Sequence, residues 1–199
     1  MKLSHLGAIA TSALVVIGVV MAIGPAYIHV LEKNRSPPVM LSFSIVDNRN
    51  IPEWCRGLSS ILESQQIKAT IFVTGRVADR YPDCVASLVS VNGVDMGSQT
   101  YSYVDLADEE DYLRAQAEVK KGKLAVDRAG NVDSRLFRAP FGSTDQNIYS
   151  LLSNSNITAD FSYKSQYNKY EDGQFVKYDL VTCECNNLSL NEVKKLLEL

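Results

Sequence analysis

The most conspicuous hydrophobic pattern is an uninterrupted apolar segment near the amino terminus. The 18 residues from Leu6 to Ile23 carry no charge, and as a helix they would extend over about 27 Å. Continuation of this segment to Val30 brings it to the thickness of a bilayer core. We therefore expect an N-terminal tail at residues 1–5, a transmembrane helix (signal anchor) at 6–31 and a linker at 32–38.

A cleaved signal peptide is the rival interpretation of this segment, because it also combines a basic start with an apolar stretch. The length of the run favours a retained anchor, as does Pro25 directly after the small residues Ala22 and Gly24. Lys2 before the span is nearly balanced by the basic residues after it, so the positive-inside rule leaves the orientation open. Four cysteines and three N-x-S/T sequons favour an extracytoplasmic soluble part. The expected location is that of a single-pass membrane protein.

From Val39 onward, short β-branched runs alternate with amphipathic stretches. This alternation predicts an α/β fold with a largely parallel sheet or barrel, and we treat residues 39–199 as one domain. The predicted strands are 39–46, 68–74, 94–97, 135–138, 157–163 and 174–182. The predicted helices begin at Pro52 and Pro82 and cover 108–127, with Asp108 as a cap, 144–152 and 191–199.

The charge balance excludes one class of partner. The chain has 20 basic and 23 acidic side chains, a net charge of −3, and the part after the linker is more acidic still. Such a domain lacks the basic surface that nucleic acid requires.

Four segments of the soluble part resemble a known family in their order and spacing. They are Ser42-Phe-Ser-Ile-Val46, Ile67-Lys-Ala-Thr-Ile-Phe-Val-Thr-Gly75, Gln99-Thr-Tyr-Ser-Tyr103 and Arg138-Ala-Pro-Phe-Gly142. Together they resemble the polysaccharide deacetylase family, the NodB homology domain of carbohydrate esterases. The resemblance implies a distorted (β/α) barrel with its site at the carboxyl ends of the strands. Because no strand follows the last predicted helix, we expect the barrel to be shortened or open at one edge.

The resemblance also implies a chemistry that this sequence does not support. Members hold a divalent metal, typically zinc, with an aspartate and two histidines, and use a further aspartate as general base and a histidine as general acid. Here Ser44 stands at the position of the base, Ile45 at the metal aspartate, and Gln99 and Tyr103 at the metal histidines. Arg138 corresponds to the arginine that orients the catalytic carboxylate. The only two histidines of the chain, His5 and His29, lie in or beside the apolar segment.

We therefore expect no intact catalytic site and no metal cofactor, with a pocket frame left behind. Phe43, Thr100, Pro140 and Gly142 belong to that frame. Gln99 and Tyr103 either hydrogen-bond a sugar or only fill the space of the lost ligands. Deep burial of Ser44, Gln99 and Tyr103 without a pocket would argue against glycan binding.

Two functions follow from these expectations. The first is a membrane-anchored, deacetylase-like pseudoenzyme that binds glycan or serves as an accessory subunit of a membrane complex. The alternative is an active carbohydrate deacetylase, a hydrolase of carbon–nitrogen bonds, with a displaced site. Its possible ligands are Asp47, Asp95, Asp105, Asp160, Cys183 and Cys185.

The four cysteines allow three complete pairings. Cys55 and Cys84 fall near the starts of successive predicted helices and so are candidates for a disulfide. A disulfide that involves Cys183 or Cys185 is a second expectation, and four reduced, buried cysteines are the alternative.

Overall fold

The computed structural model describes residues 39–47, 50–107, 111–163, 165–184 and 189–197, which belong to one unit from Pro38 to Leu199. The predicted tail, anchor and linker at 1–38 lie outside these residues. Within the described part, no helix is both long enough and apolar enough to cross a bilayer.

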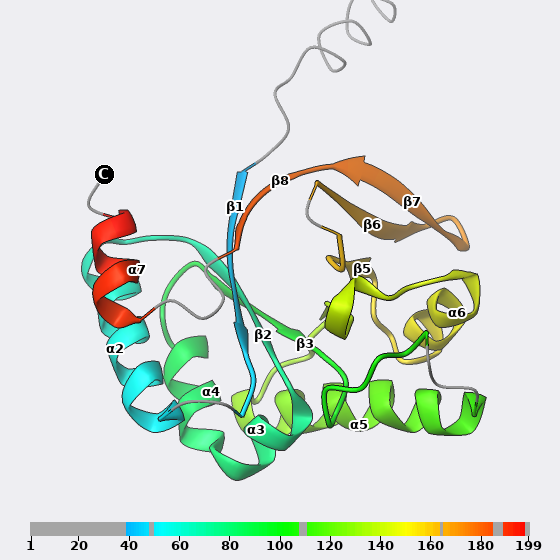
Figure 1. Ribbon diagram of the computed structural model, residues 1–199, viewed down its shortest axis with the longest axis horizontal. Coiled ribbons are helices and arrows are strands. Elements are labelled where there is room, and N and C mark those ends of the chain that lie inside the picture. Colours follow the sequence, from blue (N-terminus) through cyan, green and yellow to red (C-terminus); the bar gives the residue numbers. More distant parts are fainter. Residues whose placement is uncertain (1–38, 48–49, 108–110, 164, 185–188, 198–199) are drawn as a thin grey trace, which may run out of the picture. The chain divides into compact units, whose positions relative to one another are not determined.

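A single eight-stranded sheet forms the centre of the domain, in the order β7-β6-β5-β4-β3-β2-β1-β8 (Figure 1). Strands β1 to β5 and β8 run parallel, whereas β6 and β7 form an antiparallel hairpin. The expected α/β architecture is thus confirmed. The strands are β1 (Val39–Ile45), β2 (Ala69–Val73), β3 (Val94–Ser98), β4 (Leu136–Phe137), β5 (Ala159–Asp160), β6 (Gln166–Glu171), β7 (Gln174–Asp179) and β8 (Val181–Glu184).

The two outermost strands of the sheet are consecutive in the chain. β7 pairs with β6, and after Leu180 alone the chain continues as β8, which pairs with β1. In Figure 1 the two therefore follow one another as a single curved segment. This segment carries the chain from one edge of the sheet to the other, so the sheet curls into an incomplete barrel.

Helices follow most of the parallel strands and pack on the outside of the curved sheet (Figure 1). They are α2 (Ile51–Ser64), α3 (Gly75–Arg80), α4 (Pro82–Val89), α5 (Tyr112–Gly130), α6 (Gln146–Asn154) and α7 (Leu190–Leu197), with a short turn η1 (Pro140–Gly142) after β4.

The structure corrects four details of the predicted elements. Gly75 begins helix α3 rather than only ending a strand, and β6 is a strand that the sequence did not predict. The cap of α5 is Asp111, whose side chain accepts a hydrogen bond from Leu113 N, whereas Asp108 lies outside the described residues. The long predicted strand at 157–163 reduces to the two residues of β5.

Alternation along the strands separates an outer core from an inner face. Phe43 and Ile45 of β1 are fully buried in the outer core together with Trp54, Leu58 and other apolar side chains of the helices. Ser42 and Ser44 point to the opposite, inner face. Polar side chains therefore enter the inside of the barrel, where a site can form.

Candidate functional site

The predicted site positions gather at the carboxyl edge of the sheet. Ser44 lies near the end of β1, Gln99 directly after β3 and Arg138 directly after β4. Because these strands are parallel neighbours of one another or of β2, their carboxyl ends lie at the same edge. The structure thus brings together the segments that the sequence resemblance identifies.

The end of β1 does not offer a metal ligand. Ile45 is fully buried in the outer core, on the opposite side of the strand from Ser44. Phe43, which we expected in the pocket frame, also lies in this outer core, where its ring packs edge-on against Trp54 at 6.1 Å. The residue at the metal-aspartate position therefore acts in packing.

Arg138 occupies the inner face beside β1. Its Nη2 donates to Ser42 Oγ at 2.9 Å, its Nη1 to Ser44 Oγ at 3.4 Å, and its Nε to the Phe161 carbonyl at 3.1 Å. The guanidinium carbon also lies 4.2 Å from the centre of the Phe72 ring, a cation–π distance. The arginine is only 5% exposed. It joins β1, β2 and the end of β5 and leaves Ser44 as a hydrogen-bond acceptor.

Hydrogen bonds within the loop at 99–103 and from the loop to helix α5 fix its position. Thr100 Oγ1 accepts from Val104 N at 3.1 Å, and Glu118 of α5 accepts from the Ser102 amide and hydroxyl at 2.8 and 2.7 Å. Gly122 of α5 is required here, because a Cβ at this position would collide with the Gln99 carbonyl oxygen. The sequence analysis did not identify Glu118 or Gly122. The hydroxyl-bearing residues of the loop were the only signal for such a partner.

Gln99 and Tyr103, at the two metal-histidine positions, have opposite environments. Gln99 is 2% exposed, and within the described part of the chain its Oε1 has no hydrogen-bond partner. Tyr103 is 37% exposed, and its ring contacts that of Phe141, which is 70% exposed, at a centroid distance of 5.3 Å. The expected test of glycan binding thus gives a divided result: Ser44 and Gln99 are buried, and Tyr103 is open to solvent.

Both exposed aromatic residues have a strained backbone. Tyr103 has φ 62° and Phe141 φ 61°, in the left-handed region, which costs a residue with a side chain about 1–2 kcal/mol. Pro140 and Gly142, the latter with φ 74°, form the tight turn that holds Phe141 in place. These two residues thus shape the corner that follows β4.

A buried carboxylate fixes the same turn from the side of β5. Ser162 donates its amide and its hydroxyl to Asp160 Oδ1, and the Ser162 hydroxyl oxygen in turn accepts from Ala139 N at 2.9 Å. Burial raises the pKa of Asp160 from 3.8 to about 6, while the hydrogen bonds from Ser162 and the charge of Arg138 lower it. Asp160 therefore anchors the turn through Oδ1, whereas its buried Oδ2 has no hydrogen-bond partner among the described residues.

The other proposed ligands do not form a metal site. Asp47 pairs with Arg80 at 3.1 Å, and Asp105 accepts from the Ala107 amide at 3.0 Å. Asp95 lies near the start of β3, away from the carboxyl edge. Among the described residues, no three His, Cys, Asp or Glu side chains are arranged to hold a metal. The side chains of Cys183 and Cys185 lie outside that description. The described residues at the family positions thus do not fit a zinc ion.

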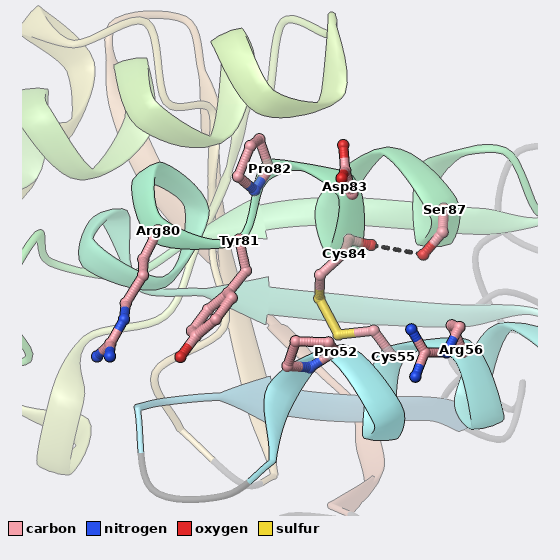
Figure 2. Close-up of a pocket in the computed structure, with 9 residues that line it drawn as sticks. All are labelled: Pro52, Cys55, Arg56, Arg80, Tyr81, Pro82, Asp83, Cys84 and Ser87. Atoms are coloured by element: carbon pink, nitrogen blue, oxygen red, sulfur yellow. Dashed lines mark hydrogen bonds between the residues drawn. A yellow bond between two sulfur atoms is a disulfide. The ribbon is translucent and has the colours of Figure 1, made fainter.

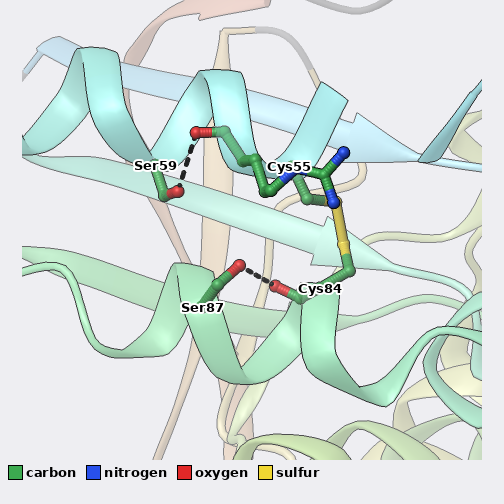
Figure 3. Close-up of a disulfide and its surroundings, with 5 residues drawn as sticks. Cys55, Ser59, Cys84 and Ser87 are labelled. Carbon is green, nitrogen blue, oxygen red and sulfur yellow. Dashed lines mark hydrogen bonds between the residues drawn. A yellow bond between two sulfur atoms is a disulfide. The ribbon is translucent and has the colours of Figure 1, made fainter. Parts of the chain in front are cut away.

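A disulfide between Cys55 of α2 and Cys84 of α4 confirms one of the predicted pairings, with Cα atoms 5.4 Å apart (Figure 3). Beside it, Pro52, Arg56, Tyr81, Pro82 and other residues line a cavity of about 260 Å³ at the starts of the two helices (Figure 2). None of the family motif positions lines this cavity. The disulfide and the cavity therefore form a feature separate from the carboxyl-edge site.

Solved structures similar to this domain include carbohydrate esterases. A family 4 carbohydrate esterase from Streptomyces lividans, in complex with acetate, matches with a TM-score of 0.55 and 22% identity over 63% of this chain and 62% of its own. A CE4 family pseudoenzyme from Bacillus anthracis matches with a TM-score of 0.64 and 14% identity over 82% of this chain and 60% of its own. At these identities the likeness shows the fold. The chain spans about three fifths of the length of these two structures.

Sequence comparison agrees with the fold. No curated protein is significantly similar to the chain. The family model for polysaccharide deacetylases, however, matches residues 32–159, which is more than half of the sequence. That range includes the β1 end, the 99–103 loop and the turn after β4. This chain belongs to the polysaccharide deacetylase family.

Proposed function

We propose that this protein is a membrane-anchored, polysaccharide-deacetylase-like pseudoenzyme that binds N-acetylated glycan without metal-dependent hydrolysis. One observation carries the proposal: Ile45, at the position of the metal aspartate, is fully buried in the outer core. Hydrolysis by the family's route needs a metal to polarise the carbonyl and a base to activate water. Ser44, at the position of the base, accepts a hydrogen bond from Arg138 instead.

Relatives support the idea that this fold can lose its activity. The Bacillus anthracis protein of similar fold is described as a pseudoenzyme, and one of its mutants as a pseudoenzyme with restored enzymatic activity. Other similar structures are peptidoglycan deacetylases, such as that from Bacillus subtilis. Glycans that contain N-acetylglucosamine are therefore the first ligands to test.

The proposed location is the extracytoplasmic side of a membrane, with residues 6–31 as the anchor. The disulfide between Cys55 and Cys84 supports this location, because disulfides persist in oxidising compartments. An accessory role in a membrane complex is the alternative function if the protein binds no glycan.

Three measurements on the full chain in mild detergent test the proposal: zinc content after dialysis, acetate release from chitin oligosaccharides, and binding of the same oligosaccharides. We expect no stoichiometric zinc, no acetate release and measurable glycan binding. Stoichiometric zinc together with acetate release that Asp47→Asn abolishes would instead establish a displaced active site. Copurification of other membrane proteins, without glycan binding, would establish the accessory role.

A further inference from the structure

The carboxyl edge presents two aromatic side chains to solvent from two different loops. Tyr103 ends the 99–103 loop, and Phe141 lies in the turn after β4. Their rings are 5.3 Å apart and inclined at 58° to each other. The two rings therefore form a corner with two differently directed faces.

The two exposed tyrosines of the β6–β7 hairpin differ from this pair. The Tyr178 hydroxyl donates to Glu171, and its ring stacks on Tyr167. The Tyr170 ring contacts Phe175, the neighbour to which it is paired across the β6–β7 hairpin. Those rings are accounted for by strand pairing within the hairpin. Tyr103 and Phe141 instead contact each other through backbone conformations that bulky residues rarely adopt. Strain of this kind is typical of functional positions.

On the inner face, the side chain at the family's base position is already engaged. Arg138 fills the inner face and is bonded to Ser42 and Ser44, and all three are buried. A ligand at this edge therefore contacts the rings rather than the family's metal position. The faces of aromatic rings carry negative charge density and attract the weakly positive C–H groups of a flat ligand. The axial C–H face of a β-linked pyranose has this chemistry.

We propose that Tyr103 and Phe141 form a platform on which a pyranose ring of the glycan stacks. Tyr103 stands at the position of a metal ligand in the family. In this protein its side chain would contact the sugar ring instead of holding a metal that binds the acetyl oxygen. This inference rests on the proposed glycan binding and adds the surface that achieves it. It also assigns a role to the strained turn at Pro140–Gly142, which presents the Phe141 ring to solvent.

Binding of tetra-N-acetylchitotetraose to the full chain in detergent tests the platform. The variants are Tyr103→Asn and Phe141→Asn, because asparagine tolerates the left-handed backbone and keeps the loops in place. Tyr112→Asn, at an exposed tyrosine of α5 that lies in neither loop, is the matched control. We expect each platform variant to bind roughly 5- to 10-fold more weakly. The control and Tyr103→Phe, which keeps the ring, should bind as wild type does.

Saturation-transfer NMR adds a readout that a merely structural role would not affect. Irradiation of the protein's aromatic protons should saturate the ring C–H protons of the sugar more strongly than its acetyl methyl group. Wild-type binding that both Asn variants retain would overturn the platform and leave glycan binding in place. An absence of binding by the wild-type chain would overturn both proposals.

Discussion

Arg138 and Ser42 are joined across the inside of the sheet by a hydrogen bond of 2.9 Å from Nη2 to Oγ. The arginine follows β4, whereas the serine lies on β1, so this bond connects strands that are not neighbours in the sheet. In the family this arginine orients a catalytic carboxylate. Here it connects the inner faces of strands and acts in stability.

The domain should therefore be less stable when Arg138 is replaced by methionine. The variant loses three hydrogen bonds and the contact with Phe72, and it leaves the serine hydroxyls to find other partners. We expect the free energy of unfolding to fall by about 2–4 kcal/mol, measured by urea denaturation. Arg135→Met is the control, because the Arg135 side chain is exposed and forms an exposed ion pair with Asp133 at 2.8 Å. This variant should change stability by less than about 1 kcal/mol. Equal effects of the two variants would contradict this account of Arg138.

Restoration of the metal aspartate should be costly in this chain. Ile45→Asp places a carboxylate in the outer core among apolar side chains. We expect a loss of at least about 3 kcal/mol in the free energy of unfolding. Tyr103→His, at one of the two metal-histidine positions and 37% exposed, should cost less than about 1 kcal/mol. A stable Ile45→Asp variant that binds zinc would show that the β1 end can turn its side chain inward.

Gly122→Ala should displace the 99–103 loop, which packs against α5 at this glycine. Alanine is the better helix former by about 1 kcal/mol, but its Cβ would collide with the Gln99 carbonyl oxygen. We expect a net destabilisation of about 1–3 kcal/mol and weaker glycan binding. Gly130→Ala, on the same helix but facing valine side chains, is the comparison and should be tolerated better.

The stability of the domain should depend on pH through Asp160. Its folded pKa of about 6 exceeds the unfolded value of 3.8, so the folded state binds the proton more tightly. Stability from this group is present below about pH 4 and is lost as the pH rises through 6, by about 3 kcal/mol in total. Asp160→Asn removes this titration. The difference in unfolding free energy between the wild type and the variant should therefore change between pH 4 and pH 7, and a constant difference would refute the assignment.

The disulfide should contribute to stability through the loop that it closes. Cys55 and Cys84 are 29 residues apart, and a loop of this length predicts about 3–4 kcal/mol. The double variant Cys55→Ala/Cys84→Ala should lose that amount, and a reducing agent should destabilise the wild type but not the variant. Peptide mapping under non-reducing conditions provides the direct check of the pairing.

Sequence patterns predicted the elements whose side chains alternate between two environments. Helix α2 was predicted because Trp54, Leu58 and Leu62 recur at helical spacing and pack into the core. Strand β6 was missed because its residues are polar and only Asn168 is buried, so no apolar alternation marks it. Helix α3 was missed because it is only 6 residues long and begins at a glycine.

The site was predictable as a set of positions but not as an arrangement. Motif spacing placed Ser44, Gln99 and Arg138 together, since parallel strands end at one edge. Motif spacing could not show that the Ile45 side chain lies on the helix side of the sheet, because that depends on how β1 pairs with its neighbouring strands. Nor could it predict the contact between Tyr103 and Phe141, which requires a left-handed backbone at two bulky residues against their local preference.

β7 pairs with β6, whereas β8, which follows it after Leu180, pairs with β1 at the other edge, and this has a consequence for how the domain folds. β1 is made first, yet the pairing of Val39 with Val181 must wait until nearly the whole domain has been synthesised. Contacts so distant in sequence slow folding, because a large loop must close before they form. During translation β1 therefore exposes an unpaired edge, the kind of surface on which chains aggregate. A chain that ends before β8 loses this pairing and helix α7, and it should fail as a soluble domain even though it keeps helices α2 to α6.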